Sequence, residues 1–240
     1  MKDCLLDLVK HTVDLGSIDT VKIVGDQKGT KINGLAEDLS VLLQGQYTNA
    51  VPDFIGTFGM PNLAKLKTLL NLEEYREDAK LTITKKDTGE PTGIKFENKV
   101  GDFRNNYRFM SSDVITVKLQ TAVMKPVTWN IDFEPTVASI QRLGWQMLAN
   151  SEETTFQVRT ENGDLKFFFG DHSTHAGDFV FHNRVTGQLK RAWTYPAKTI
   201  MSVLGLSGDK TFKISDEGVA QITIDSGIAI YNYILPAFTK

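Results

Sequence analysis

The sequence predicts an α+β fold built from two similar domains. Three observations support this. Apolar residues follow helical periodicity in a few short segments, strand-like segments fill most of the remainder, and the order of segments in the first half recurs in the second.

The first half is expected to open with a helix over residues 3–15, where apolar residues recur at i, i+3 and i+4 and Gly16 follows. Strands are predicted at 20–24, 39–48 and 51–58. A second helix is predicted to begin at Pro61, a favoured first-turn residue, and to end near residue 72. Its predicted buried stripe consists of Leu63, Leu66, Leu69 and Leu70. Three further strands are predicted at 80–84, 93–98 and 103–110.

Residues 111–125 alternate apolar and polar side chains up to a break at Met124-Lys125-Pro126, which predicts an extended connector. The predicted organisation is therefore a first domain at 1–112, an interdomain connector at 113–127 and a second domain at 128–240.

The second half is expected to open with a helix over 134–150. Its predicted buried side consists of Val137, Ile140, Leu143, Gly144, Met147 and Leu148. Strands are predicted at 154–159, 165–170, 178–184 and 188–194, followed by a short helix from Pro196. The last predicted strands are 210–215, 219–225 and 228–235.

Each half is predicted to follow the order of a helix, four strands, a helix and three strands, although only three strand segments are assigned between the helices of the first half. Leu8 lies 132 residues before Ile140, and Pro61 lies 135 residues before Pro196, so the offset drifts by only a few residues. The alternative to two repeated domains is one large β-rich domain with three or four helices.

Composition limits the possible functions. Of 240 residues, 41% are apolar, and 27 Lys and Arg stand against 29 Asp and Glu, giving a net charge of −2. This balance excludes a protein that coats nucleic acid through bulk charge, so a nucleic-acid binder must concentrate its cations on one surface. A single cysteine, Cys4, excludes an internal disulfide and a cysteine-based zinc site, and is typical of a reducing compartment.

The amino-terminal segment does not match a secretory signal, because Asp3 and Asp7 interrupt its apolar residues. No apolar run approaches the ~20 residues of a transmembrane helix. We therefore expect a cytoplasmic protein without a membrane partner.

Motifs for catalysis are incomplete. The segment 25–31 lacks the Gly-Lys-Ser/Thr ending of a phosphate loop, and 205–208 lacks the frame of a nucleophile elbow. His172, His175 and His182, with Asp171 and Asp178, are either a metal site or a polar loop, and their spacing favours the loop. The residues predict no catalytic centre and no cofactor.

The order of elements and the carboxy-terminal segment Tyr231-Asn232-Tyr233-Ile234-Leu235-Pro236-Ala237-Phe238 resemble the DNA sliding clamps. The sequence looks most like the DNA polymerase processivity factors of T4-type phages, and the trimeric eukaryotic and archaeal clamps share the element order. The resemblance covers nearly the whole chain.

This resemblance implies the DNA clamp fold, with two repeated domains that each have two helices packed on antiparallel sheets. It also implies a homotrimeric ring with its helices on the inner wall. Duplex DNA would pass through the ring without sequence preference. The ring would tether a DNA polymerase, would be opened by a clamp loader and would perform no covalent chemistry.

A sliding ring needs weak attraction to phosphate, which Lys and Arg on inner helices provide through counterion release. The candidate DNA-binding residues are Lys10, Lys65, Lys67, Arg142 and Lys198. The alternative for each is an ordinary solvated side chain. The first helix also carries Asp3, Asp7 and Asp14, which weakens the expectation that it contacts DNA.

The resemblance also implies an apolar pocket that receives a peptide from the polymerase and the clamp loader. The matching residues are Tyr233, Leu235, Pro236 and Ala237, with Val123 and Met124 from the connector. The alternative is that the tyrosine and leucine are strand core. The sequence is also compatible with two other functions. One is a non-encircling processivity factor held on DNA by charge, and the other is a β-rich phage structural or assembly protein.

Overall fold

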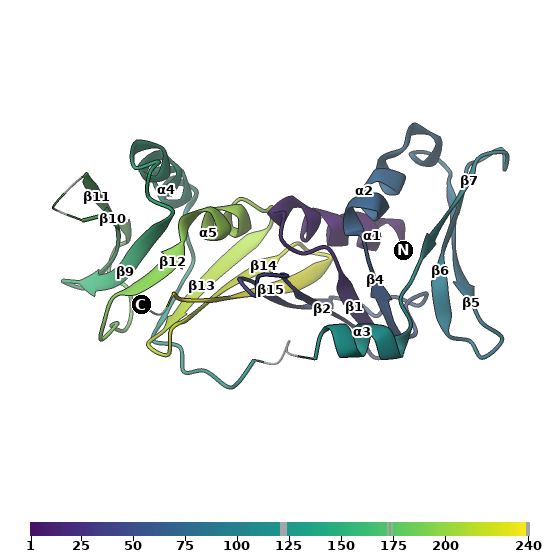
Figure 1. Ribbon diagram of the computed structural model, residues 1–240, viewed down its shortest axis with the longest axis horizontal. Helices are drawn as coiled ribbons and strands as arrows, with labels where there is room; N and C mark the ends of the chain where they lie inside the picture. The colour runs from purple at the N-terminus through teal and green to yellow at the C-terminus, as the bar shows by residue number, and fades with distance from the viewer. Residues whose placement is uncertain (121–123, 172, 174, 239–240) are drawn as a thin grey trace. The chain divides into compact units, whose positions relative to one another are not determined.

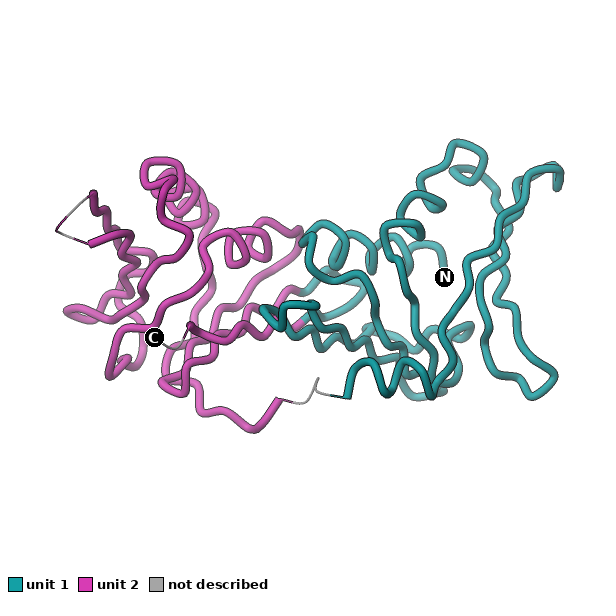
Figure 2. The backbone as a smooth tube through the Cα atoms, viewed as in Figure 1, with its two compact units in different colours: residues 1–123, 225–231 teal, residues 124–224, 232–240 magenta. Residues whose placement is uncertain are grey.

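The computed structural model describes residues 1–120, 124–171, 173 and 175–238. The chain forms two compact units (Figure 2). Unit 1 contains residues 1–123 and 225–231, and unit 2 contains residues 124–224 and 232–240. The chain first passes from unit 1 to unit 2 inside the predicted connector 113–127.

Unit 1 opens with the predicted order of helix, four strands, helix and three strands within its described residues (Figure 1). The elements are α1 (Lys2–Lys10), a 3-10 turn (Val13–Leu15), β1 (Val21–Gly25), β2 (Thr30–Leu35), β3 (Leu42–Tyr47), β4 (Gly56–Met60), α2 (Leu63–Asn71), a 3-10 turn (Glu73–Tyr75), β5 (Lys80–Lys85), β6 (Pro91–Glu97), β7 (Arg104–Arg108) and α3 (Ser112–Lys118). The prediction of an α+β fold with antiparallel sheets is confirmed.

The sheets of unit 1 are antiparallel. One has the order β4-β1-β2-β3 and continues into the first residues of β15 (Ala229–Pro236), and the other has the order β5-β6-β7. In the first sheet Ile23 pairs with Ile32 on one side and with Phe58 on the other. All three side chains are fully buried, so this ladder forms part of the core that supports α1 and α2.

The first helix ends earlier than predicted. Leu5, Leu8 and Val9 are buried as expected, but α1 stops at Lys10 and a separate 3-10 turn follows. The Thr12 hydroxyl donates to the Leu8 carbonyl at 2.7 Å, a local bond that competes with helix continuation. Gly16 ends the turn with φ 74°, as the sequence predicts for a helix-stop glycine.

The second helix begins at Leu63 rather than at Pro61. Asn62, with φ 51°, is the N-cap, and its side-chain oxygen accepts a 3.0 Å bond from the Lys65 amide. The prediction that Pro61 occupies the first turn is therefore wrong, because asparagine supplies the cap that proline cannot. The predicted leucine stripe is buried.

Residues 112–118 form the helix α3, so the expectation of a fully extended connector is wrong. Ile115 is completely buried, whereas Val114 and Val117 are exposed. The alternation of apolar and polar residues that predicted an extended segment thus included two valines that face solvent. A Cβ on Gly59 would lie 2.8 Å from Ile115 Cγ1, so the glycine allows α3 to approach β4 closely.

Unit 2 repeats the order of unit 1 after one short strand, within its described residues. Its elements are β8 (Ile131–Phe133), α4 (Val137–Ala149), β9 (Thr155–Glu161), β10 (Asp164–Gly170), β11 (Ala176–His182), β12 (Trp193–Pro196), α5 (Ala197–Leu204), β13 (Asp209–Ser215), β14 (Val219–Asp225) and the later residues of β15. Strand β12 is shorter than the predicted 188–194, and the Lys190 amide bonds to the Asp216 carboxylate instead of to a neighbouring strand.

The sheets of unit 2 have the orders β11-β10-β9-β12 and β15-β14-β13-β8. Their core is rich in phenylalanine. The rings of Phe167 and Phe181 stack with centroids 4.3 Å apart, and Phe156 stacks on Phe167 at 4.5 Å. These contacts fix β9, β10 and β11 beneath α4.

The predicted buried side of the 134–150 helix is wrong in part. Leu143 is fully buried, but Val137 is 73% exposed and Leu148 is 79% exposed. Trp145, also on α4, is 66% exposed. α4 contacts β11 and α5. These contacts leave several of its apolar side chains uncovered. In the described ranges, no helix has both the length and the apolar character needed to cross a membrane.

Candidate nucleic-acid interface and partner surface

In unit 1 the candidate cations lie on two helices that pack together. Lys10 at the end of α1 and Lys65 in the first turn of α2 are exposed. Lys67 on α2 forms an ion pair with Asp14, and both side chains are 40% exposed. The acidic residue that follows α1 therefore offsets part of the charge on α2.

In unit 2, Lys198 is exposed in the first turn of α5. Arg142 on α4 is exposed as well, but its guanidinium is turned toward β11. Its Nη1 donates to the Val180 carbonyl at 3.3 Å, and its Cζ lies 5.3 Å from the centroid of the Phe179 ring. Arg142 is thus engaged by its own unit, in contrast to Lys198.

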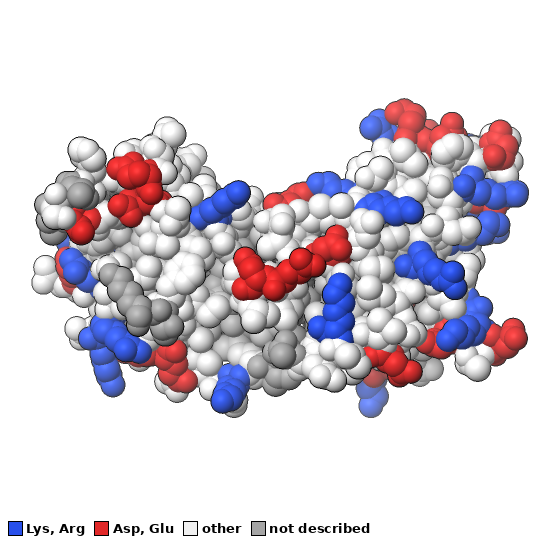
Figure 3. Space-filling model, in the orientation of Figure 1, with Lys and Arg blue, Asp and Glu red and all other residues white. Residues whose placement is uncertain are grey.

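Charge is distributed sparsely around these helices. Figure 3 shows Lys and Arg interspersed with Asp and Glu and separated by uncharged surface, without one continuous basic patch on the face drawn. Exposed cations attract phosphate without reading bases, and salt screens them beyond about 8–10 Å. Such an arrangement can hold DNA only weakly by charge.

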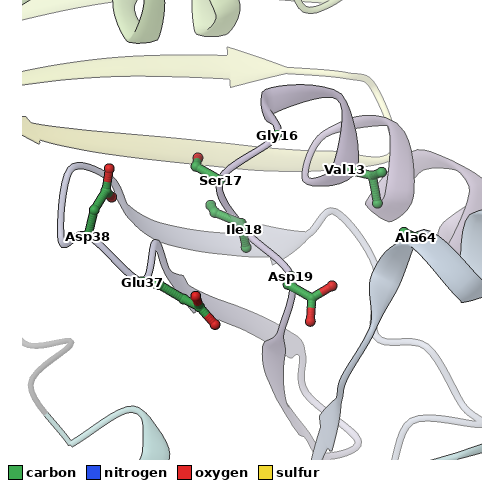
Figure 4. A pocket seen from close by; sticks show the side chains of 8 residues that line it. All are labelled: Val13, Gly16, Ser17, Ile18, Asp19, Glu37, Asp38 and Ala64. Atoms are coloured by element: carbon green, nitrogen blue, oxygen red, sulfur yellow. The ribbon is translucent and has the colours of Figure 1, made fainter.

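A cavity of 540 Å³ in unit 1 lies between the segment before β1 and the β2–β3 loop. Figure 4 shows the carboxylates of Asp19, Glu37 and Asp38 among its lining residues. Asp38 accepts bonds from the Ser40 hydroxyl at 2.6 Å and from the Ser40 amide at 3.0 Å, and these bonds lower the pKa of Asp38. Three carboxylates make this cavity unsuitable for phosphate.

A buried polar cluster ties α1 to β15 inside unit 1. The Asp7 carboxylate accepts bonds from the Tyr231 hydroxyl at 2.8 Å and the Ser226 hydroxyl at 2.9 Å, and pairs with His11 Nδ1 at 3.2 Å. Burial would raise the pKa of Asp7, but the bonds from His11 and Tyr231 outweigh it, so the pKa is lowered. His11 stacks on Tyr231 with centroids 4.5 Å apart. Because His11 and Tyr231 are enclosed, the cluster leaves no room for a substrate and is structural.

The predicted pocket residues of β15 divide into two sets. Tyr233 and Leu235 are fully buried, so their side chains support the surface from inside unit 2. Pro236 is exposed, Ala237 is half-buried and Phe238 is 55% exposed. The accessible part of the predicted partner site is therefore the end of the chain.

Backbone bonds hold this end in place. The Ala237 amide donates to the Gly218 carbonyl at 2.8 Å, and the Phe238 amide donates to the Thr194 carbonyl at 2.9 Å. From the connector, Met124 is half-buried, and Val123 lies outside the described residues. The segment thus presents Pro236 and Phe238 from fixed positions.

The histidine-rich loop is only partly described, because His172 lies outside the described residues. Among the residues that the structure does describe, no three His, Cys, Asp or Glu side chains are grouped so that they could hold a metal ion.

Sequence reasoning missed the exposed apolar face of α4. Val137, Trp145 and Leu148 fall within about 80° of one another at 100° per residue. A signal was present, since the apolar residues of this helix cover more of its circumference than one buried stripe needs. The prediction of a single buried side wrongly places Val137 and Leu148 in the core.

Comparison with known proteins identifies the fold. PCNA from Thermococcus kodakaraensis superposes with a TM-score of 0.70, 8% identity, and coverage of 99% of this chain and 97% of that chain. A. fulgidus PCNA bound to the C-terminal region of FEN-1 gives a TM-score of 0.68, 9% identity, and coverage of 100% and 97%. No protein-family model matches the sequence, and no curated protein matches it. The likeness over the full length shows that the chain has the DNA sliding-clamp fold.

Proposed function

We propose that this chain is a non-enzymatic DNA sliding clamp of the phage type. Three copies close into a ring around duplex DNA. The ring tethers a DNA polymerase and thereby makes its synthesis processive. The observation that carries the proposal is the clamp fold across the whole chain, with 97% of each compared PCNA chain covered. The repeated order of elements supports it, because two similar domains per subunit give a three-membered ring six similar segments.

Ring closure requires strand edges that can pair between copies. The edge of β4 is bridged by Met110 and the edge of β12 by Phe238, whereas β5, β7, β8 and β11 end their sheets without such a bridge among the described residues. β7 carries exposed Arg108 and an Arg104 that pairs with Glu97, and β11 carries exposed Asp178. We therefore propose that β7 of one copy pairs with β11 of the next, which removes both open edges.

The exposed face of α4 supports the same assignment. Trp145 and Leu148 lie on the helix that packs against β11, and both are largely exposed in the single chain. Apolar side chains grouped in this way mark partner surfaces. A second copy paired with β11 would cover them.

DNA would be held by topology and by weak charge. Lys10, Lys65 and Lys198 are exposed on helices and would contact phosphates, and Lys67 and Arg142 would contribute less because each already has a partner in its own unit. Few contacts suit a ring that must slide, since each additional phosphate contact strengthens binding and its salt dependence.

The protein partners would bind the chain end. The A. fulgidus PCNA structure holds the C-terminal region of FEN-1. By analogy, we propose that Pro236, Ala237 and Phe238, with Val123 and Met124 from the predicted connector, receive a peptide from the polymerase and from the clamp loader. Tyr233 and Leu235 would keep this surface rigid from below.

A threading experiment separates encirclement from attachment by charge. Duplex DNA is anchored to a bead at one end, the protein is added, and the free end is then blocked with a bulky protein. A ring threaded over the end is expected to stay on blocked DNA in about 0.5 M salt, where phosphate contacts are weak. Cutting the DNA near the block should release it.

Each rival function predicts another result. A non-encircling factor held by charge would dissociate equally from blocked and from unblocked DNA in high salt. A structural or assembly protein would show no retention at low salt either. Either outcome would contradict the ring proposal.

A further inference from the structure

Strand β11 ends its sheet, but its open edge is not bare. Along this strand the carbonyls of Asp178 and Val180 lie on the side away from β10 and accept bonds from α4. Gln146 Nε2 donates to Asp178 at 3.3 Å, and Arg142 Nη1 donates to Val180 at 3.3 Å. Side chains thus occupy acceptors that another strand would use.

The spacing of helix and strand explains why two side chains suffice. Residues four apart on a helix are separated by about 6.0 Å along its axis, and residues two apart on a strand by about 6.6 Å. Arg142 and Gln146 therefore match every second carbonyl of β11, with the helix and the strand running in opposite directions.

Two neighbouring residues set this geometry. Gly177 has no side chain, and a Cβ there would lie 2.6 Å from Gln146 Oε1 and 2.8 Å from Asn150 Nδ2. Buried Asn150 donates to Gln146 Oε1 at 3.0 Å, which orients the Gln146 amide so that its Nε2 faces Asp178. The contact is built by specific residues on both elements.

The two side-chain hydrogen bonds can also be replaced by bonds to another strand. Both lie at the long end of the hydrogen-bond range, and both donors sit on side chains that reach the surface. The amides of Asp178 and Val180 face the same open side as their carbonyls, because both groups of a strand residue point the same way. An incoming strand would offer an acceptor for each amide and a donor for each carbonyl.

We propose that Arg142 and Gln146 guard the β11 edge in the free subunit and are displaced when a second copy of this chain pairs with it. This inference rests on the proposed ring. The exposed Asp178 on β11 and the exposed Arg108 on β7 favour this occupant through opposite charge. Closing the ring would exchange the side-chain bonds for backbone bonds, and opening it would restore them.

The test measures self-association by sedimentation equilibrium without DNA, for wild type, Arg142→Ala/Gln146→Ala and the control Lys10→Ala. Lys10 is an exposed side chain at the end of α1, outside the β11 edge and the apolar face of α4. Removing the guard is expected to raise the association constant about three- to tenfold, because association no longer breaks those bonds. The control should match wild type.

Hydrogen exchange on wild type provides a second readout that needs no variant. The Asp178 and Val180 amides should exchange quickly in dilute monomer and slowly in the assembled form. Association of the double variant equal to or weaker than wild type, or unchanged exchange of these amides on assembly, would overturn the guard while leaving the ring intact. Failure of wild type to associate at all would instead contradict the ring.

Discussion

α1 of unit 1 and α4 of unit 2 open the two repeats, and different chemistry holds them in place. At the repeat offset of 132 residues, Asp7 corresponds to Ser139 and His11 to Leu143. His11 and Leu143 are both buried, and His11 belongs to a hydrogen-bonded cluster whereas Leu143 has an apolar side chain. The same position in the fold is thus filled by a titratable contact in one unit and an apolar contact in the other.

The outer faces of the two helices differ as well. α1 ends in exposed Lys10, whereas α4 exposes Val137, Trp145 and Leu148 and turns Arg142 toward β11. We propose that the two helices serve different contacts. In our account the first helix faces DNA, and the fourth faces another copy of the chain.

The largest expected effect comes from the apolar anchor of α4. Within Val137–Ala149, all of it described, Leu143 alone is buried, so Leu143→Ala should lower the free energy of unfolding by about 2–5 kcal/mol. Leu66→Ala on α2 is the matched control, because three other buried leucines share its helix. Urea denaturation would check both. The Leu143→Ala variant should also self-associate nonspecifically, because loosening α4 exposes β11. An unchanged free energy of unfolding and unchanged self-association would show that α4 is anchored by other residues.

The polar anchor of α1 should respond to pH. The pKa of Asp7 is lowered in the folded chain, so its contribution to stability is full at neutral pH and is lost as the pH falls below the ordinary aspartate value of about 3.9. Asp7→Asn should cost about 1–3 kcal/mol at pH 7 and flatten the acid limb of the stability profile. Denaturation curves from pH 7 to pH 3 would measure this. A variant with the same acid limb as wild type would remove the cluster as a source of pH dependence.

A smaller effect is expected from single cations. Lys65→Ala and Lys198→Ala should each reduce the slope of log binding constant against log salt on short duplexes by about 0.9, the value for one phosphate contact. Arg142→Ala should reduce it less, because its guanidinium is engaged by β11. Fluorescence anisotropy would report the slopes, with Lys86→Ala on the β5–β6 hairpin as the unchanged control. Equal slopes for all variants would contradict the helix assignment.

The smallest effect on stability is expected at the apolar face of α4. Trp145→Gln and Leu148→Gln should change the free energy of unfolding by less than about 0.5 kcal/mol, because both side chains are exposed. The same variants should weaken self-association, while Lys10→Gln on α1 should not. Sedimentation would compare the three. If all associate like wild type, the face of α4 does not contact another copy.

The sequence allowed the α+β class, the repeated order and the buried stripe of α2 to be predicted, because these depend on local periodicity. It did not predict β2, whose Asn33 and Gly34 are typical of turns but here pair within a sheet. The conformation of α3 depends on Gly59, more than fifty residues away, which admits Ile115. Such contacts are not encoded within a short window.

The candidate site was predictable in kind rather than in detail. Lys10, Lys65 and Lys198 are exposed as a DNA-contacting role requires, but the engagement of Lys67 by Asp14 and of Arg142 by β11 is a tertiary effect. Likewise, the carboxy-terminal motif does not reveal that Tyr233 and Leu235 are buried while Phe238 is exposed. Spacing along the chain cannot separate these cases, since adjacent strands decide them.

Sedimentation equilibrium of the purified chain across concentration tests the central claim most directly. The account predicts a species of three times the 26.8 kDa subunit mass that dissociates on dilution without stable intermediates. A chain that stays monomeric at high concentration, or that forms a closed dimer instead, would contradict the ring.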